Sequence, residues 1–240
     1  MPLEVELSPF QKEKLQSYFK FLEPDANGKL ESHSLDRILK RIFEFTRWQK
    51  DSAKALQCKE IHTAFFEILF EKAVEEGGKR GMASLDDWYH IWAHILPGCK
   101  GMSNFPVWLR LMPKMLFDMI DRNGDGLITE EELIRFYREM VKVEDPALEG
   151  HTKEAYKDMT DGGRYPLNLD GYEQIFANFL IGKTPHGPGK YIFGCFKHDN
   201  TNWQLIAPLS THDDAHSAKP KEENKIVQEK RPKKFGVLFT

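Results

Sequence analysis

Apolar residues recur at spacings of three and four along most of the chain, which is typical of amphipathic helices. Between residues 8 and 23 a Ser8-Pro9 start suits a capped first helical turn. Further periodic stretches lie at about 35–43, 46–76, 85–96, 112–120, 133–141, 151–159 and 176–180. Pro113 should kink or restart the helix in which it lies. The pattern predicts an all-α fold of short helices joined by polar loops.

The polar segment 121–132 lies between two of these helices and matches an EF-hand calcium loop at every ligand position. Gly126 at position 6 permits the sharp turn that such a loop needs. The predicted metal ligands are Asp121, Asn123, Asp125, the backbone carbonyl of Leu127, Thr129 and Glu132, at positions 1, 3, 5, 7, 9 and 12. Hard oxygen donors with three carboxylates favour Ca²⁺. An ordinary acidic turn is the alternative, since turns also select Asp, Asn and Gly.

Three other segments fit the same twelve-residue template without a full set of ligands. Segment 23–34 ends in Ser34 where a bidentate glutamate is required, so we expect weak calcium binding or none there. Segment 76–87 has Arg80 at position 5, and segment 160–171 has Arg164 at position 5 and Gly171 at position 12. We expect no calcium at these two. They serve as scaffold, because one helix-loop-helix unit cannot bury its apolar face alone.

The predicted fold is therefore an EF-hand protein with four helix-loop-helix units in two pairs, forming one compact body. Breakers between Pro97 and Gly101 place the boundary between the pairs. We predict an N-terminal pair at 1–100 with two degenerate loops, and a C-terminal pair at 101–196 with one complete and one degenerate loop. Residues 197–240 form a C-terminal extension, which we expect to be partly disordered because much of it is charged and poor in apolar residues.

The order of the four units, with a complete third loop, resembles the invertebrate sarcoplasmic calcium-binding proteins and the calexcitin group. The residues that carry the resemblance are 117–132, 176–180 and 189–194, and the likeness extends over about 8–196. It implies a compact helical body with a buried apolar interior, acting as a cytosolic Ca²⁺ buffer or sensor. Those relatives usually keep two or three working loops, whereas this chain keeps one.

Composition narrows the expected partners. The net charge of −3 does not indicate a nucleic-acid-binding protein, and no run of about 18 apolar residues indicates a membrane span. Three scattered cysteines indicate neither a disulfide framework nor a zinc cluster, which fits a reducing cytoplasm. We expect a cytoplasmic monomer whose partner is the calcium ion, with any protein target unidentified.

Two other functions stay open as alternatives. Residues 177–184 fit a loose phosphate-loop pattern, and juvenile hormone diol kinase, a nucleotide-dependent enzyme, resembles the same calcium-binding group. The context opposes this, because a phosphate loop opens a helix whereas this segment ends one. An aromatic-rich interior could also serve a coelenterazine-type photoprotein or luciferin carrier, although aromatic residues in a helical core are usually packing. We predict that the chain is not an enzyme.

Overall fold

The computed structural model describes residues 6–197. The predicted extension 197–240 lies outside this range, apart from its first residue. Among the described residues, the α-helices in chain order are α1 (Pro9–Phe21), α2 (Ser32–Thr46), α3 (Ala53–Glu75), α4 (Leu85–Ile95), α5 (Val107–Arg110), α6 (Met112–Ile120), α7 (Glu130–Arg135), α8 (Leu148–Met159) and α9 (Leu169–Ile181). Two 3-10 helices, η1 (Met102–Asn104) and η3 (Pro188–Phe193), a π-helix, η2 (Phe136–Val141), and strands β1 (Lys29–Glu31) and β2 (Met82–Ser84) complete the fold.

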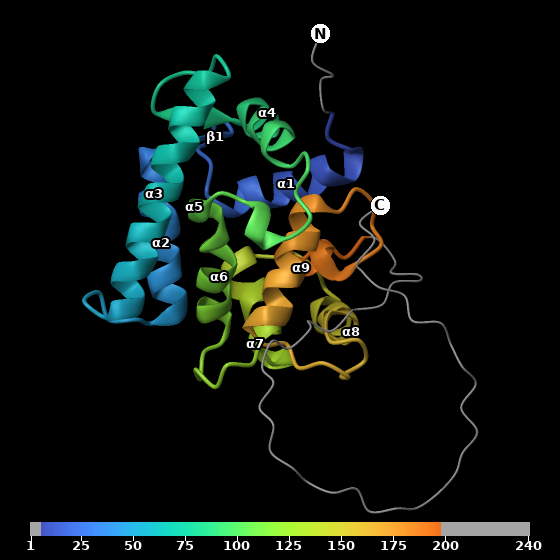
Figure 1. Cartoon of the computed structure of the whole chain (residues 1–240). Helices are drawn as coiled ribbons and strands as arrows, with labels where there is room; N and C mark the ends of the chain where they lie inside the picture. Colours follow the sequence, from blue (N-terminus) through green and yellow to red (C-terminus); the bar gives the residue numbers. More distant parts are fainter. Residues whose placement is uncertain (1–5, 198–240) are drawn as a thin grey trace, which may run out of the picture.

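The helices form four helix-loop-helix units, α1–α2, α3–α4, α6–α7 and α8–α9 (Figure 1). The all-α EF-hand fold predicted from the sequence is confirmed. Pro113 restarts a helix as expected, because α5 ends at Arg110 and α6 begins at Met112 with the proline in its first turn. No helix in the described part of the chain is both long and apolar enough to cross a membrane.

Side-chain caps fix where several helices begin. The Ser8 hydroxyl accepts a hydrogen bond from Gln11 N, and the Gln11 side chain accepts one from Ser8 N, at 3.1 and 3.0 Å. Ser84 and Thr129 make the same reciprocal arrangement at the starts of α4 and α7. Each cap satisfies amide groups that the first helical turn leaves without partners. The loops therefore enter their helices at defined residues.

The first two loops pair through a short antiparallel ladder. Lys29, Leu30 and Glu31 of β1 lie opposite Ser84, Ala83 and Met82 of β2. Leu30 and Ala83, at position 8 of their loops, are fully buried. This ladder joins the first two units through backbone hydrogen bonds between their loops. It helps both loops to keep their shape without a full set of metal ligands.

One hydrophobic core runs through both halves of the molecule. Tyr18 of α1 stacks on Phe193 of η3 with ring centroids 4.9 Å apart, and also meets Trp88 of α4 and Phe179 of α9 edge to face. In Figure 1, α1 lies beside α4 on one side and α9 on the other. The proposed boundary near residue 100 therefore separates two pairs of units along the sequence, but the two pairs share one hydrophobic core.

The first turns of α1 cap the end of α9. Ser8 Oγ donates to the Lys183 carbonyl at 2.9 Å, and Gln11 Nε2 donates to the Ile181 carbonyl at 3.2 Å. The buried Lys14 ammonium donates to the Gly182 carbonyl at 2.8 Å and to the Asn178 carbonyl at 3.2 Å. These donors satisfy carbonyls that a helix C-terminus leaves free, and the Lys14 charge suits the negative end of the helix dipole.

Candidate metal centre

The complete loop 121–132 is held at both ends by helices packed into the core. α6 enters it with a buried face that includes Met115, Leu116 and Ile120. α7 leaves it, capped by the Thr129 hydroxyl, which accepts from Glu132 N at 3.3 Å. Leu133 and Phe136 anchor the outgoing side in the core. The loop therefore has fixed ends and an exposed, oxygen-rich middle.

Asp121, at position 1, folds the first half of the loop around its carboxylate. It is 6% exposed, and its two oxygens accept from Gly124 N at 2.8 Å and Gly126 N at 3.0 Å. Gly124 and Gly126 have φ angles of +74° and +84°. These left-handed conformations favour glycine, so Gly126 makes the sharp turn predicted for position 6.

Asn123 and Asp125 continue the turn. Asn123 Oδ1 accepts from Asp125 N at 2.8 Å, and Asp125 Oδ1 accepts from Leu127 N at 2.9 Å. The Asn123 amide also donates to Asp125 Oδ2 at 2.9 Å. The Leu127 side chain is exposed, as expected where only the backbone carbonyl is needed as a ligand.

Glu132, at position 12, reaches back across the loop to its beginning. Its Oε1 accepts from Arg122 N at 2.9 Å, while its Oε2 accepts from Thr129 N and Thr129 Oγ1 at 3.0 and 2.9 Å. The carboxylate thus links positions 2, 9 and 12.

In this structure the loop carboxylates bind N–H and hydroxyl groups of the loop and do not converge on a single point. No group of three or more His, Cys, Asp or Glu side chains within residues 6–197 is placed so that it could hold a metal ion. The ligand set therefore stays a prediction. The donors themselves fit calcium, because all are hard oxygens gathered on one folded loop.

The third and fourth loops are joined by a backbone bond at position 8. Ile128 N donates to the Leu167 carbonyl at 2.8 Å. The Ile128 carbonyl accepts from the Tyr156 hydroxyl of α8, at 3.1 Å. The fourth loop is closed by its own bonds: Gly163 N donates to Thr160 Oγ1, and Arg164 pairs with Asp161 at 3.0 Å.

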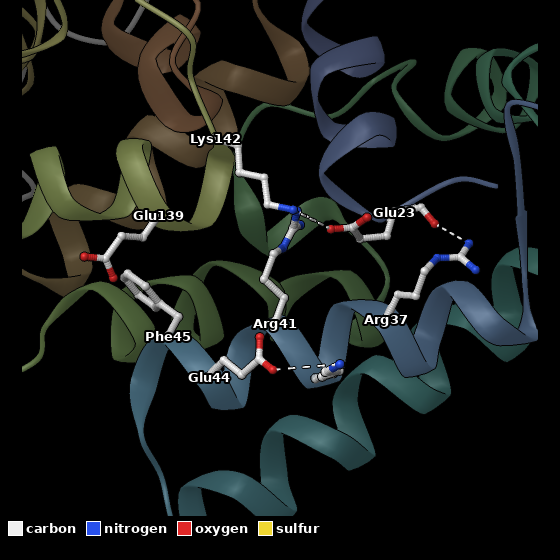
Figure 2. Close-up of a pocket in the computed structure, with 8 residues that line it drawn as sticks. Glu23, Arg37, Arg41, Glu44, Phe45, Glu139 and Lys142 are labelled. Atoms are coloured by element: carbon white, nitrogen blue, oxygen red, sulfur yellow. Dashed lines mark hydrogen bonds and ion pairs between the residues drawn. The ribbon is translucent and has the colours of Figure 1, made fainter. Parts of the chain in front are cut away.

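The first loop, 23–34, is held by arginines of the protein (Figure 2). Arg37 Nη2 donates to the Glu23 carbonyl at 2.7 Å and to Ser34 Oγ at 2.8 Å, joining positions 1 and 12. The Glu23 carboxylate pairs with Arg41 at 2.5 Å and with Lys142 at 3.5 Å. The carboxylate that would bind an ion at position 1 is therefore already neutralised.

These side chains line an open pocket of about 390 Å³ between α2 and the end of η2. The lining residues are Glu23, Arg37, Lys40, Arg41, Glu44, Phe45, Glu139 and Lys142. Burial lowers the pKa of Arg41, and the charge of Glu23 opposes that shift. Arg135 of α7 also donates to the Phe45 carbonyl at 2.5 Å and lies 4.1 Å from the centre of the Phe45 ring. The outgoing helix of the complete loop thus contacts the first unit directly.

The second loop, 76–87, is closed without a metal. Its position 1 residue, Glu76, lies 2.9 Å from the His94 ring. Its position 12 residue, Asp87, accepts from Ser84 N and Ser84 Oγ, which makes it part of the α4 cap. Both carboxylates are thereby occupied in local contacts.

The phosphate-loop pattern at 177–184 does not have the geometry of a nucleotide site. Residues up to Ile181 belong to the last turns of α9, and the Lys14 ammonium binds the Gly182 carbonyl that follows. The segment presents carbonyl groups from a helix C-terminus, where a phosphate needs amide groups from a helix N-terminus.

Sequence reasoning missed three side chains that shape the loops, Tyr156, Arg37 and Arg41. Arg37 and Arg41 lie in the first turns after position 12 of the first loop. Two cations there, combined with Ser34, are a signal that the loop is closed by the protein itself. Tyr156 gives no comparable signal, since it lies 28 residues from Ile128, whose carbonyl it contacts.

Comparison with known proteins agrees with this geometry. The EF-hand family model matches residues 114–137, which include the complete loop, most of α6 and all of α7. The sarcoplasmic calcium-binding proteins I, III and IV of Branchiostoma lanceolatum are 23% identical over 179 residues, or 72% of this chain and 91% of the relative.

Two solved structures have a similar fold. A sarcoplasmic calcium-binding protein from amphioxus superimposes with a TM-score of 0.66 at 21% identity, covering 78% of this chain and 98% of that one. The calcium-loaded apo form of a coelenterazine-binding protein from Renilla muelleri gives a TM-score of 0.53 at 14% identity, covering 77% of this chain and 95% of that one. The predicted resemblance to the sarcoplasmic calcium-binding proteins is confirmed, and with it the EF-hand fold.

Proposed function

We propose that this chain is a cytoplasmic calcium-binding protein of the buffer-like or weakly switching kind, with one Ca²⁺ site in the loop 121–132. The observation that carries the proposal is the complete set of oxygen donors in this loop. In each of the other three loops an arginine stands at or beside the ligand positions, or a ligand carboxylate is missing. The EF-hand match and the calcium-binding relatives support calcium as the cofactor.

Asp121, Asn123 and Asp125 would supply side-chain oxygens, Leu127 its carbonyl, Thr129 an oxygen directly or through water, and Glu132 both carboxylate oxygens. The positive ion offsets the repulsion among three carboxylates. The turn around Gly126 and the cap at Thr129 already hold the loop backbone, so binding requires mainly that the side chains turn inward. The residues bind and orient an ion, and we propose no catalytic role for them.

A buffer-like role follows from the partner loop. A strong switch opens a pair of loops when both fill, but the fourth loop has Arg164 and Gly171 at positions 5 and 12. Opening would also expose aromatic core, at about 25 cal/mol for each Å² of apolar surface. We therefore expect only a small calcium-induced change, confined to the second half.

The test is a calorimetric calcium titration of the full chain, together with the fluorescence of an apolar dye with and without Ca²⁺. We expect one tight site per chain and little change in dye fluorescence. Two or more tight sites, or none, would contradict the single-site assignment. A large calcium-induced rise in dye fluorescence would contradict the buffer-like role and indicate a sensor.

A second candidate, an internal small-molecule carrier, is favoured by three buried polar atoms. Tyr18 Oη, Trp92 Nε1 and Tyr172 Oη have no hydrogen-bond partner in the described structure. Their surroundings are nevertheless filled by aromatic contacts such as Trp88 with Trp92 and Phe117 with Tyr172. A coelenterazine titration followed by tryptophan fluorescence tests this candidate: saturable quenching would support it, and no quenching would exclude it.

A further inference from the structure

Tyr156 stands outside the metal ligands, yet its hydroxyl contacts the backbone of the complete loop. The contact joins α8, the incoming helix of the fourth loop, to Ile128 at position 8 of the third loop, at 3.1 Å. The ring is half-buried and packs against the core. A tyrosine hydroxyl is protonated at neutral pH and therefore able to donate this bond.

The Tyr156 contact replaces a backbone hydrogen bond that the pairing of the third and fourth loops lacks. In the first pair, β1 and β2 form a ladder of three residues on each strand. In the second pair, Ile128 N donates to the Leu167 carbonyl, but the reverse bond from Leu167 N to the Ile128 carbonyl is not among the hydrogen bonds of the described backbone. The fourth loop is bent there, since Asn168 N turns back to the Pro166 carbonyl at 2.9 Å. Tyr156 supplies the donor that the bent backbone does not.

Because each peptide group is planar, fixing its carbonyl also fixes the direction of its N–H, and so the Tyr156 contact affects the groups that orient the ligands. The carbonyl and N–H of a trans peptide point in opposite directions. Ile128 N points to Leu167, so the Leu127 carbonyl of the same peptide points back toward the loop. In the next peptide, Tyr156 holds the Ile128 carbonyl, so Thr129 N points the other way, where it donates to Glu132 Oε2 at 3.0 Å.

We infer that Tyr156 is a positioning residue for calcium binding: its hydroxyl fixes the 128–129 peptide, which in turn orients Thr129 and the closing Glu132. The inference rests on the proposed calcium site at 121–132. It assigns to the partner unit a direct part in holding the ligands of the third loop, through one side chain of α8.

The experiment compares the wild-type chain with Tyr156→Phe, which keeps the ring and removes only the hydroxyl. A hydrogen bond of typical net strength corresponds to about a fivefold change in affinity. We expect calcium to dissociate about fivefold faster from the variant in stopped-flow mixing with a chelator, and the infrared carboxylate band assigned to Glu132 to shift in the calcium-loaded form. The matched control is Tyr165→Phe, whose tyrosine lies in the fourth loop and has no hydrogen bond to the third.

Equal dissociation rates for wild type and Tyr156→Phe would overturn the inference while leaving the calcium site intact. No calcium binding by the wild type would instead overturn the proposed function. The unfolding temperature of each calcium-free protein separates positioning from general stability: a variant that binds more weakly with an unchanged calcium-free unfolding temperature supports positioning. A loss of affinity matched by an equal loss in Tyr165→Phe would contradict it.

Discussion

The first and third loops have similar sequences, but different groups contact their carboxylates. Both place at position 3 a side-chain oxygen that accepts from the backbone N–H two residues on, Asp25 from Asn27 N at 3.0 Å and Asn123 from Asp125 N at 2.8 Å. Both have a glycine at position 6 with positive φ, Gly28 at +72° and Gly126 at +84°. Their turns are thus alike, and the difference lies in what neutralises the oxygens.

In the first loop the protein supplies its own cations. Arg37 joins the two ends of the loop and Arg41 pairs with the position 1 carboxylate. In the third loop the carboxylates of Asp121, Asp125 and Glu132 accept hydrogen bonds from backbone N–H groups, and no arginine or lysine side chain pairs with them within the described residues. Protein cations thus offset the charge of the first loop, whereas the carboxylates of the third loop have no side-chain cation beside them.

The largest effect expected from this comparison is at the closing glutamate. Glu132→Gln removes one charge and the bidentate contact, so calcium affinity should fall by about a hundredfold or more. Calorimetry measures the loss. Glu131→Gln, an equal change of charge at the exposed neighbouring residue, is the control and should keep most of the affinity. Tight binding by Glu132→Gln would show that the loop closes on another ligand.

The first loop offers the reverse test. Ser34→Glu restores the missing ligand at position 12, but we expect it to leave the stoichiometry at one calcium per chain, because Arg37 would pair with the new carboxylate. Adding Arg37→Ala should produce a second, weaker site in the same titration. A second site in Ser34→Glu alone would mean that the missing glutamate, and not the internal cation, keeps the first loop from binding.

Removing the carboxylate from the internal ion pair should destabilise the first unit. Glu23→Gln leaves the Arg41 side chain, only 12% exposed, without its charge partner, and should lower the free energy of unfolding by about 2–3 kcal/mol. Lys142→Gln removes the outer cation, 64% exposed, and should cost less than about 0.5 kcal/mol. Urea unfolding of both variants checks the difference. Equal losses would place the stabilising contact at Lys142 as much as at Arg41.

A somewhat smaller effect than that of Glu23→Gln concerns Lys14, an internal cation that can lose its charge. Burial lowers its pKa to about 7, opposed by the charge of Cys195. Between pH 7 and 10 the unfolded chain therefore binds more protons at this residue than the folded one, so its contribution to stability rises with pH. We expect a rise of about 2 kcal/mol from pH 7 to 9.

Urea unfolding at both pH values measures this rise, and Lys14→Met should reduce it. Lys20→Met, at an exposed position of the same helix, should keep it. An unchanged pH dependence in Lys14→Met would contradict the assignment.

Much of this architecture can be predicted from the chain itself. Helical periodicity, the twelve-residue template and the glycine at position 6 locate the complete loop 121–132 and the degenerate loop 160–171, because these features are local. The internal cations and Tyr156 could not be predicted in this way. Arg41 pairs with Glu23 across the first loop, and Lys142 pairs with it although the two residues are 119 positions apart in the sequence. The Tyr156 hydroxyl of the fourth unit donates to the Ile128 carbonyl of the third. Contacts of this kind depend on how the units pack.

The capping of α9 by the first turns of α1 also bears on how the protein is made. Lys14 leaves the ribosome early, whereas the carbonyl of Gly182 that it binds follows 168 residues later. At a synthesis rate of about 5–20 residues per second, Gly182 is synthesised on the order of ten to thirty seconds after Lys14. During that time the Lys14 ammonium can remain hydrated, and α1 can settle against α4 through Tyr18 and Trp88. Burial of the lysine then marks the completion of the fold, because its acceptors exist only after the last long helix has been synthesised.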